Sequence, residues 1–167
     1  MVACVALLPA MAMAAMPAPY TARYDVLRNG DRAGQSTVSL KALGGGSAEL
    51  HSSTNGSEGL AAIAGASVEE RSVLRWNEGA PETVSWDYHQ KIAWKSRDRS
   101  LSVDAAAHRL DLRDKDNRYS PPYKPGVLDR HAVTVAIMQD VAAGRTGELR
   151  YSVPDKDEMG TWVFRVG

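Results

Sequence analysis

The chain has 167 residues, and its 20 lysines and arginines balance its 20 aspartates and glutamates, so the formal net charge is zero. A nucleic-acid-binding protein typically carries a basic stripe, and the interleaved charges of this chain argue against that class. The length predicts a single domain, and no segment beyond the first 15 residues is apolar enough for a transmembrane helix.

The N-terminal residues have the features of a signal peptide. Met1–Ala15 is almost wholly apolar and rich in alanine, and it is too short to span a bilayer as a helix. Ala12 and Ala14 place small residues at the −3 and −1 positions of a signal-peptidase site. We therefore expect a leader over residues 1–14, incomplete because no basic segment precedes its apolar run. The rest is expected to be an exported, periplasmic protein with one β-rich domain over residues 15–167. The alternative is an apolar N-terminal strand or helix in the core.

Alternating apolar and polar residues predict a series of strands in the first half of the domain. The segment from Tyr20 to Val26 alternates in this way, and Asn29-Gly30-Asp31 behind it is a strong hairpin-turn signal. Strands are also expected over Gly34–Leu43 and Ala48–Thr54, with three glycines between them. The small apolar segment Gly56–Gly65 fits either a short helical turn or a wide crossover.

The second half of the domain continues this pattern. Val68–Trp76 and Thr83–Tyr88 form a predicted strand pair, in which Val84, Trp86 and Tyr88 share one face. Shorter alternating segments follow at residues 92–94, 101–103, 110–112, 149–153 and 162–166. The chain stops inside the last of these, which predicts that the domain is truncated at its C-terminus and that one or more final strands are missing.

One long helix is predicted from Asp129 to Ala143. Asp129 can act as its N-cap, because its carboxylate can accept hydrogen bonds from the free amides of the first turn, and Gly144 suits the left-handed position that ends a helix. An apolar stripe at helical spacing is formed by Val133, Ala136, Ile137 and Val141. The predicted fold is therefore mainly β (α+β): a curled antiparallel sheet, or an open half-barrel, packed on one long helix at about 129–143.

Four short motifs follow one another along the mature chain. They are Tyr-x-Ala-x-Tyr-x-Val at Tyr20–Val26 with Gly30 and Gly34, Ser57–Ala61, Glu69–Ser72 followed by Pro81, and Val127–Arg130 at the entry to the predicted helix. In their order these motifs resemble the bacterial domain-of-unknown-function 3108 family, over nearly all of the mature chain. The resemblance implies an exported, mostly β protein without an assigned activity. It is similar to the open half-barrel sheets of periplasmic carriers of lipoproteins and lipids, by analogy of fold alone.

No motif for catalysis, metal binding or cofactor binding stands out in the sequence. The four histidines, His51, His89, His108 and His131, lack the spacing of zinc ligands, and surface or packing roles explain them. The single cysteine, Cys4, lies in the predicted leader, so the mature chain has no thiolate nucleophile or ligand. Neither a Gly-x-Ser-x-Gly elbow nor a glycine-rich phosphate loop is present. We therefore predict no metal, no cofactor and no catalytic residue.

Four aromatic side chains are the candidate binding residues. Trp86, Tyr88 and Trp94 lie on neighbouring predicted strands, and Trp76 just precedes them, so together they can line a concave apolar groove. The alternative is that they form the core beneath the helix. The groove predicts a non-catalytic binding or protein-interaction protein. Its partner would be a lipid, another apolar ligand or an envelope protein, with no nucleic acid and no integral membrane span.

Two other functions are compatible with the sequence. A cell-envelope hydrolase would need two acids, drawn from Glu69, Asp87 and Asp129, that face each other across a cleft. A purely structural envelope component would instead have a filled core and no groove. The positions of these acids and the presence or absence of a cavity discriminate between the three functions.

Overall fold

The computed structural model describes residues 16–57, 59, 62 and 65–167. The predicted leader over residues 1–14 therefore lies outside the described residues. The same is true of residues 58, 60–61 and 63–64, so the choice between a helical turn and a crossover for the Gly56–Gly65 segment also lies outside them.

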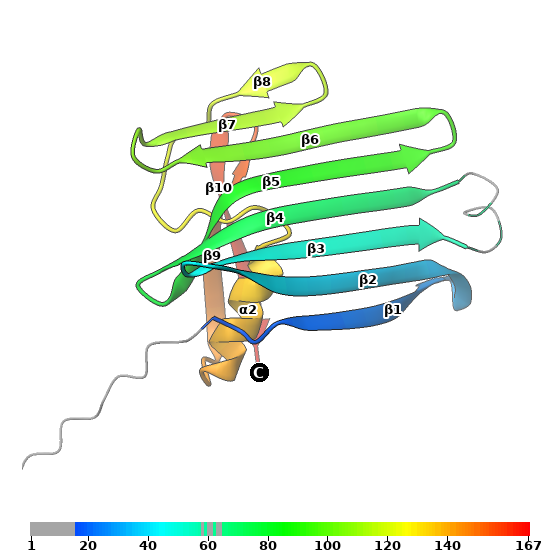
Figure 1. Ribbon diagram of the computed structural model, residues 1–167, viewed down its shortest axis with the longest axis horizontal. Coiled ribbons are helices and arrows are strands. Elements are labelled where there is room, and N and C mark those ends of the chain that lie inside the picture. Colours follow the sequence, from blue (N-terminus) through cyan, green and yellow to red (C-terminus); the bar gives the residue numbers. More distant parts are fainter. Residues whose placement is uncertain (1–15, 58, 60–61, 63–64) are drawn as a thin grey trace, which may run out of the picture.

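The fold is mainly β and antiparallel, as the sequence predicts (Figure 1). Eight strands of the described chain form one sheet in the order β1 to β8, so each strand pairs with its sequence neighbour. The strands β9 and β10 form a separate hairpin, and β1 and β8 are the two edges of an open sheet. The strand bounds are β1 Tyr20–Arg28, β2 Asp31–Gly44, β3 Ser47–Gly56, β4 Ser67–Asn77, β5 Ala80–Ile92, β6 Lys95–Asp104, β7 Arg109–Asp114, β8 Asn117–Tyr119, β9 Gly147–Asp155 and β10 Glu158–Val166.

Glycines shape the first two hairpins. Asn29 and Gly30, between β1 and β2, have φ angles of 55° and 91°, the left-handed pair that a two-residue type I′ turn requires. Further along β2, a Cβ atom at Gly34 would lie 2.2 Å from the backbone oxygen of Asn55 on β3. The two strands therefore approach this closely only because residue 34 has no side chain.

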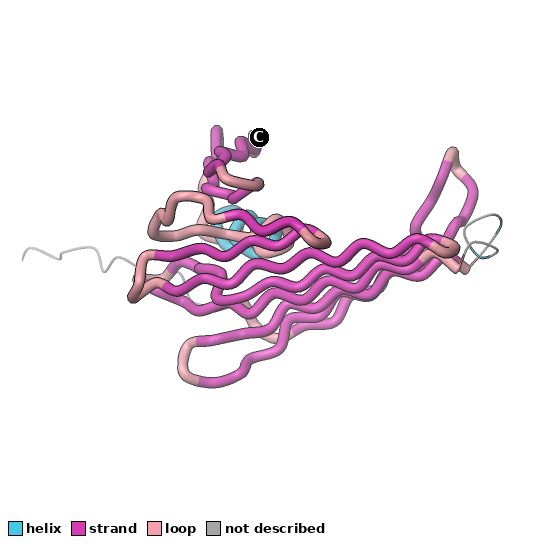
Figure 2. The backbone as a smooth tube through the Cα atoms, turned by 90° about the horizontal axis from the view of Figure 1, so that it is seen from above, coloured by secondary structure: helices cyan, strands magenta, loops and turns pink. Residues whose placement is uncertain are grey.

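A second layer covers only part of one face of the sheet. Figure 2 shows the helix α2 (Val133–Ala142) and the β9–β10 hairpin gathered over one end of the sheet, on what is termed here the inner face. Beneath them, Leu40, Leu50 and Leu74 from three strands pack in one buried cluster with Val133 and Val135 of α2. A second buried cluster consists of Trp86, Leu101, Leu110, Leu112 and Val127. No other helix or strand of the described residues lies over the rest of this face.

The prediction of a long helix from Asp129 to Ala143 is wrong. The regular helix α2 begins at Val133, and its N-cap residue is Ala132, which makes no side-chain cap bond. The residues before it form a turn because the sheet holds Asp129, whose N–H donates to Thr83 Oγ1 at 2.7 Å. The Asp129 carboxylate does accept amide hydrogen bonds from residues 131 and 132, but these bonds close the turn rather than cap the regular helix.

The predicted C-terminal end of the helix is confirmed. Gly144 has a φ of 75°, and the N–H of Arg145 donates to the carbonyl of Asp140 at 2.9 Å, as in a Schellman motif. The predicted apolar stripe is only partly right, because Val141 is exposed whereas Val135 is fully buried. Among the described residues, no helix is long and apolar enough to cross a membrane.

The prediction that Val84 shares one face with Trp86 and Tyr88 is wrong, because the strand contains a β-bulge. Leu74 of β4 pairs with Thr83 of β5, whereas its neighbour Val73 pairs with Ser85, so Val84 is an extra residue in β5. Thr83 is consequently buried on the inner face, and Val84 is exposed. The bulge thus brings a hydroxyl group, rather than the predicted valine, beneath the second layer.

The prediction that a new strand begins at Ile92 and Trp94 is also wrong. Ile92 is the last residue of β5, and β6 begins at Lys95. Between them Ala93 has a φ of 53°, which reverses the chain in a tight turn. The turn contains no glycine, proline or asparagine, so the usual sequence signal is absent.

Replacing Leu74 by alanine should destabilise the protein by about 2–5 kcal/mol, because this fully buried side chain packs between the sheet and α2. Leu27→Ala is the matched control: its side chain is 63 % exposed, so we expect a change within about 0.5 kcal/mol. Urea unfolding followed by circular dichroism measures both. Equal losses in the two variants would contradict this packing.

Candidate functional site

A cavity of about 200 Å³ lies between the inner face of the sheet and the β9–β10 hairpin. It is termed the tryptophan cavity, because Trp86 on β5 and Trp162 on β10 line it from opposite layers. Trp86 is buried, whereas Trp162 is 42 % exposed, so the cavity has a closed floor and a rim that reaches solvent. Its apolar walls are Trp86, Leu101, Leu112, Val153, Pro154 and Trp162.

Charged side chains complete the lining. They are Arg99, Asp129, Arg130 and Asp155. Arg99 Nη2 lies 3.6 Å from Asp155 Oδ1, and its Nε lies 3.5 Å from Asp114 Oδ2; both separations are longer than a good hydrogen bond. The guanidinium carbon of Arg99 lies 5.5 Å from the ring centroid of Trp86, within the range of a cation–π interaction.

Arg130 approaches the same cavity from the turn before α2. Its guanidinium carbon lies 5.3 Å from the ring centroid of Tyr88, and its Nε lies 3.5 Å from Glu70 Oε1. The same Glu70 oxygen accepts a hydrogen bond from Trp86 Nε1 at 2.9 Å. Burial raises the pKa of the Glu70 carboxyl, and the bond from Trp86 and the charge of Arg130 act in the opposite direction. Glu70 thus ties the tryptophan of the floor to the arginine of the rim.

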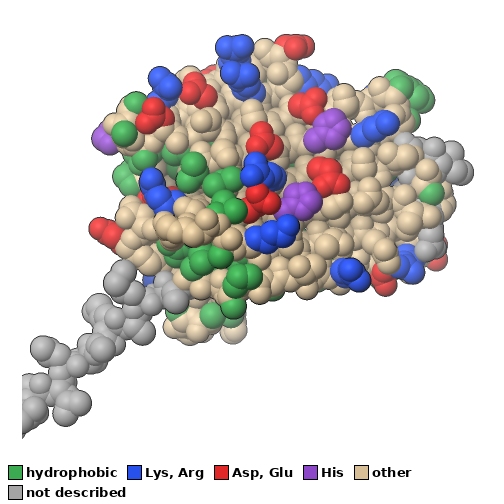
Figure 3. Space-filling view, viewed as in Figure 1, with side chains coloured by type: hydrophobic (Ala, Val, Ile, Leu, Met, Phe, Trp, Pro, Cys, Tyr) green, Lys and Arg blue, Asp and Glu red, His purple; other side chains and the backbone are tan. Residues whose placement is uncertain are grey.

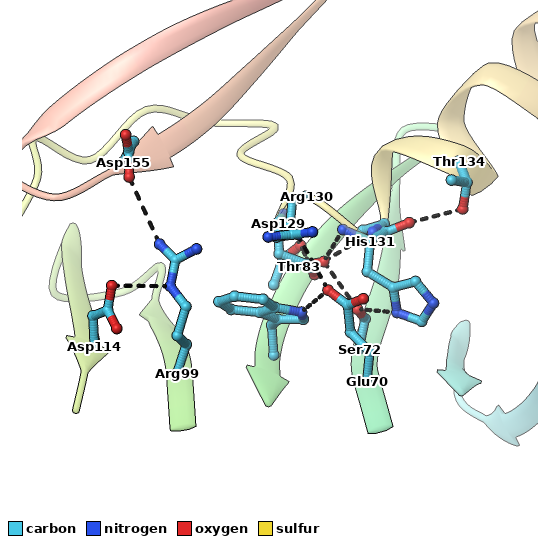
Figure 4. A network of polar contacts seen from close by, with 12 residues as sticks. Glu70, Ser72, Thr83, Arg99, Asp114, Asp129, Arg130, His131, Thr134 and Asp155 are labelled. Carbon is cyan, nitrogen blue, oxygen red and sulfur yellow. Dashed lines mark hydrogen bonds and ion pairs between the residues drawn. The ribbon is translucent and has the colours of Figure 1, made fainter. Parts of the chain in front are cut away.

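Beneath the cavity, Asp129 is the centre of buried hydrogen bonds that join the two layers (Figure 4). Its Oδ1 accepts from Ser72 Oγ of β4 at 2.9 Å, and its Oδ2 accepts from Thr83 Oγ1 of β5 at 2.8 Å. Its Oδ1 also accepts from the backbone N–H groups of His131 and Ala132, both at 2.8 Å. Asp129, Ser72, Thr83 and His131 are together termed the carboxylate cluster, and all four are buried.

The number of hydrogen bonds at Ser72 determines which nitrogen of His131 carries a proton. Ser72 has one hydroxyl proton, which it donates to Asp129. Nδ1 of His131 lies 3.1 Å from the same Ser72 oxygen, so Nδ1 must carry a proton and donate it. The neutral ring then has its lone pair on Nε2.

Burial drives the two titratable groups of the cluster toward their neutral forms. It raises the pKa of Asp129 to about 6, although the four hydrogen bonds to the carboxylate lower it. Burial lowers the pKa of His131 to about 4, and the nearby His51 and Arg130 add to this effect. At neutral pH the carboxylate is therefore mostly ionised and the imidazole neutral. Because Ser72 is fully buried, the Asp–Ser–His chain connects the layers and does not present its hydroxyl to a substrate.

The structure brings together two of the four predicted binding aromatics. The rings of Trp86 and Tyr88 are 6.1 Å apart, centroid to centroid, on the inner face. Trp76 packs against the cluster under α2, where its Nε1 donates to Gln139 Oε1 at 3.0 Å, so it belongs to the core. Trp94 lies in the turn after β5 and is 89 % exposed, so it lines no groove with the others.

The three acids considered for a hydrolase do not converge. Asp129 is buried beneath the second layer. Glu69 and Asp87 alternate with the inner-face residues Glu70 and Trp86 in their strands, so their side chains lie on the opposite, outer face. Figure 3 shows acidic, basic and histidine side chains intermingled over that outer face. Asp129 therefore does not face either of the other two acids across a cleft.

Several polar residues at and beneath the cavity are missing from the sequence-based predictions, although a signal for three of them exists. Glu70 and Ser72 lie in the same alternation phase of β4 as the buried Leu74, and Arg99 lies in the phase of Leu101 in β6. A polar residue in the apolar phase of a strand must find a partner when it is buried. That pattern identifies all three residues before their partners are known.

Comparison with known proteins adds no relative. No protein-family model matches the chain, and no curated protein or solved structure shows significant similarity to it. The resemblance to the domain-of-unknown-function 3108 family therefore stays a prediction. Within the part of the chain that the structure describes, no group of three or more histidine, cysteine, aspartate or glutamate residues is placed to hold a metal ion.

The carboxylate cluster predicts two opposite pH dependences of stability. The folded-state pKa of Asp129, about 6, is above its unfolded value, so its contribution to stability falls as the pH rises from about 4 to 6. The folded-state pKa of His131, about 4, is below its unfolded value, so its contribution rises over the range from about 4 to 6.5. In the wild-type protein the two contributions oppose each other.

Single substitutions should separate these contributions. Relative to wild type, Asp129→Asn should gain stability as the pH rises from 4 to 6, by up to about 1.4 kcal/mol per pH unit, because the penalty of ionising Asp129 is gone. His131→Asn should lose stability, relative to wild type, over the same range. Urea unfolding at a series of pH values measures both slopes. Differences from wild type with the same sign of slope in both variants would refute the assignment.

Proposed function

We propose that the protein is an exported, non-catalytic binding protein that holds the apolar part of a small ligand in the tryptophan cavity. The observation that carries this proposal is the cavity itself, which has tryptophan on two sides and a rim open to solvent. A protein cavity of about 150 Å³ accepts benzene. The volume of about 200 Å³ therefore suits an aromatic ring or a short acyl segment.

Two observations favour binding over the alternatives. A purely structural component is expected to have a filled core, whereas here the sheet and the hairpin leave a cavity between them. A hydrolase with paired carboxylates needs free oxygens facing each other. Both oxygens of Asp129 instead accept hydrogen bonds from the protein, and Glu70 is bonded to Trp86.

The location and the family are proposed from the sequence. The apolar leader over residues 1–14 supports export to the periplasm. The ordered motifs between Tyr20 and Arg130 support membership of the domain-of-unknown-function 3108 family. An open sheet that a second layer covers only in part is compatible with a carrier of lipids or lipoproteins, and this remains an analogy of architecture.

The four tryptophans provide a direct test, because each indole N–H gives its own signal in a ¹H–¹⁵N correlation spectrum. On titration with 1-hexanol, a neutral apolar probe, we expect the signals of Trp86 and Trp162 to shift. Those of Trp76, in the core, and Trp94, in the turn, should stay in place. Single Trp→Phe variants assign the signals. A titration that leaves Trp86 and Trp162 unmoved would remove the proposal.

Removal of one wall of the cavity should weaken binding. Trp162→Ala should lower the affinity for 1-hexanol about tenfold, because the probe loses its contact with the hairpin. Trp94→Ala is the matched control and should leave the affinity unchanged, since Trp94 is far out in solvent. Isothermal titration calorimetry measures both. Equal effects of the two substitutions would place the probe elsewhere.

A further inference from the structure

We infer that the ligand of the tryptophan cavity carries a carboxylate head group, which Arg99 binds at the rim. The inference rests on the proposed function and deepens it: the apolar part of the ligand lies between Trp86 and Trp162, and a single negative charge lies beside them. The ligand class is thus a small carboxylic acid with an apolar body, such as a short-chain fatty acid or an aryl-alkanoic acid.

The first observation concerns the unused hydrogen-bonding capacity of Arg99. Its Nε is the one buried side-chain nitrogen or oxygen of the described residues that lacks a hydrogen-bond partner. Its two carboxylate neighbours, Asp114 and Asp155, lie at 3.5 and 3.6 Å, which is ion-pair contact rather than a good hydrogen bond. A guanidinium group is built to donate two parallel hydrogen bonds to one carboxylate. Arg99 therefore lines the cavity with donors that the protein itself leaves poorly used.

The second observation is the difference between the acids around this arginine. Asp114 is engaged by Arg97, whose Nε donates to it at 2.9 Å and whose Nη2 makes a second, shorter contact, and these bonds lower the pKa of Asp114. Within the described chain, Asp155 accepts no comparable side-chain hydrogen bond; Arg97 acts on it only through its charge, and the Asp155 side chain is 74 % exposed. Asp155 is thus the weakly held counter-ion of Arg99. The carboxylate of a ligand is a chemically equivalent group and can take its place.

The charged residues that line the cavity, Arg99 and Arg130 against Asp129 and Asp155, balance one another, so an added anion must displace Asp155. Glu70 is bonded to Trp86 and lies beside Arg130, and the Asp129 oxygens accept hydrogen bonds from the carboxylate cluster. Arg130 adds a second cation to the cavity lining. When Asp155 swings out to solvent, Arg99 and a ligand carboxylate form the new pair. Because Arg99 also lies over the face of Trp86, the head group comes to rest directly above the apolar floor.

A comparison of two probes with the same chain length tests the inference. Hexanoate and 1-hexanol differ only in their head groups, so both should shift the indole signals of Trp86 and Trp162. Hexanoate should bind about tenfold more tightly or better, because a hydrogen bond between charged groups adds to the shared apolar contact. The affinities are measured by isothermal titration calorimetry at neutral pH and low salt, where the acid is ionised and the charges are least screened.

Substitutions then assign the preference to Arg99. Arg99→Gln should abolish the preference for hexanoate and leave the affinity for 1-hexanol unchanged. Arg113→Gln is the matched control and should leave the preference unchanged, because Arg113 is an exposed arginine of β7 that does not line the cavity. Asp155→Asn should raise the affinity for hexanoate several-fold, because it removes the competing carboxylate. Asp116→Asn, an exposed acid in the turn before β8, should change nothing.

The possible outcomes separate the two proposals. If 1-hexanol shifts Trp86 and Trp162 but hexanoate binds no more tightly, the carboxylate inference fails while the proposed function stands. If neither probe shifts these signals, both fail. A preference for hexanoate that survives Arg99→Gln also overturns the inference. Should Arg99→Gln prove unfolded in a thermal melt, Asp155→Asn becomes the deciding variant, because Asp155 is exposed. An unchanged or lower affinity of this variant for hexanoate would then contradict the carboxylate inference.

Discussion

The buried Asp129 carboxylate is the interaction on which the rest of the structure depends. It binds hydroxyl groups from two strands of the sheet, Ser72 and Thr83, and at the same time closes the turn that leads into α2. A buried carboxylate without such partners would cost several kcal/mol. The position of the second layer over the sheet is therefore set by a polar constraint, and apolar packing of Leu40, Leu50 and Leu74 against α2 supplies the bulk of the stability.

The cavity is a consequence of this arrangement. The carboxylate cluster and α2 are fixed at one end of the sheet, and the hairpin that follows α2 lies over the same end (Figure 2), with the cavity between it and the sheet. Trp162 therefore faces Trp86 across a space instead of packing against it. The polar groups at the rim, Arg99 and Arg130, lie over the aromatic rings of Trp86 and Tyr88, so charge and apolar surface meet in one place. That combination is what distinguishes this cavity as a candidate ligand site.

The sequence predicts most of the strands because each signal is local. Alternation identifies the segments, and the Asn29-Gly30 turn connects the first two in the observed register. The sequence does not predict the first residue of the helix correctly, because the partners of Asp129 are far away in the sequence, at Ser72 and Thr83. The bulge at Val84 is not predictable for the same reason, since only the pairing with β4 reveals the extra residue.

The candidate site is predictable only in part. Trp86 and Tyr88 share a strand face, so their proximity follows from period-two geometry. Trp76 is on the same face but beneath α2, and Trp94 is in a turn that has no glycine or proline to mark it. The role of Trp162 depends on how the hairpin docks, which no local pattern encodes. Arg99 is recognisable in the sequence, because it is a charged residue in the same alternation phase as the buried Leu101. Only the structure shows that it lines the cavity.

A crystal structure of the protein soaked with 6-bromohexanoate is the sharpest test of the ligand site, because the bromine is located by anomalous scattering without reference to the protein coordinates. We expect the bromine between Trp86 and Trp162, the carboxylate within hydrogen-bond distance of Arg99, and Asp129 still bonded to Ser72 and Thr83. A cavity filled by the protein's own side chains, or a bromine found only outside the space between the sheet and the hairpin, would contradict this ligand site.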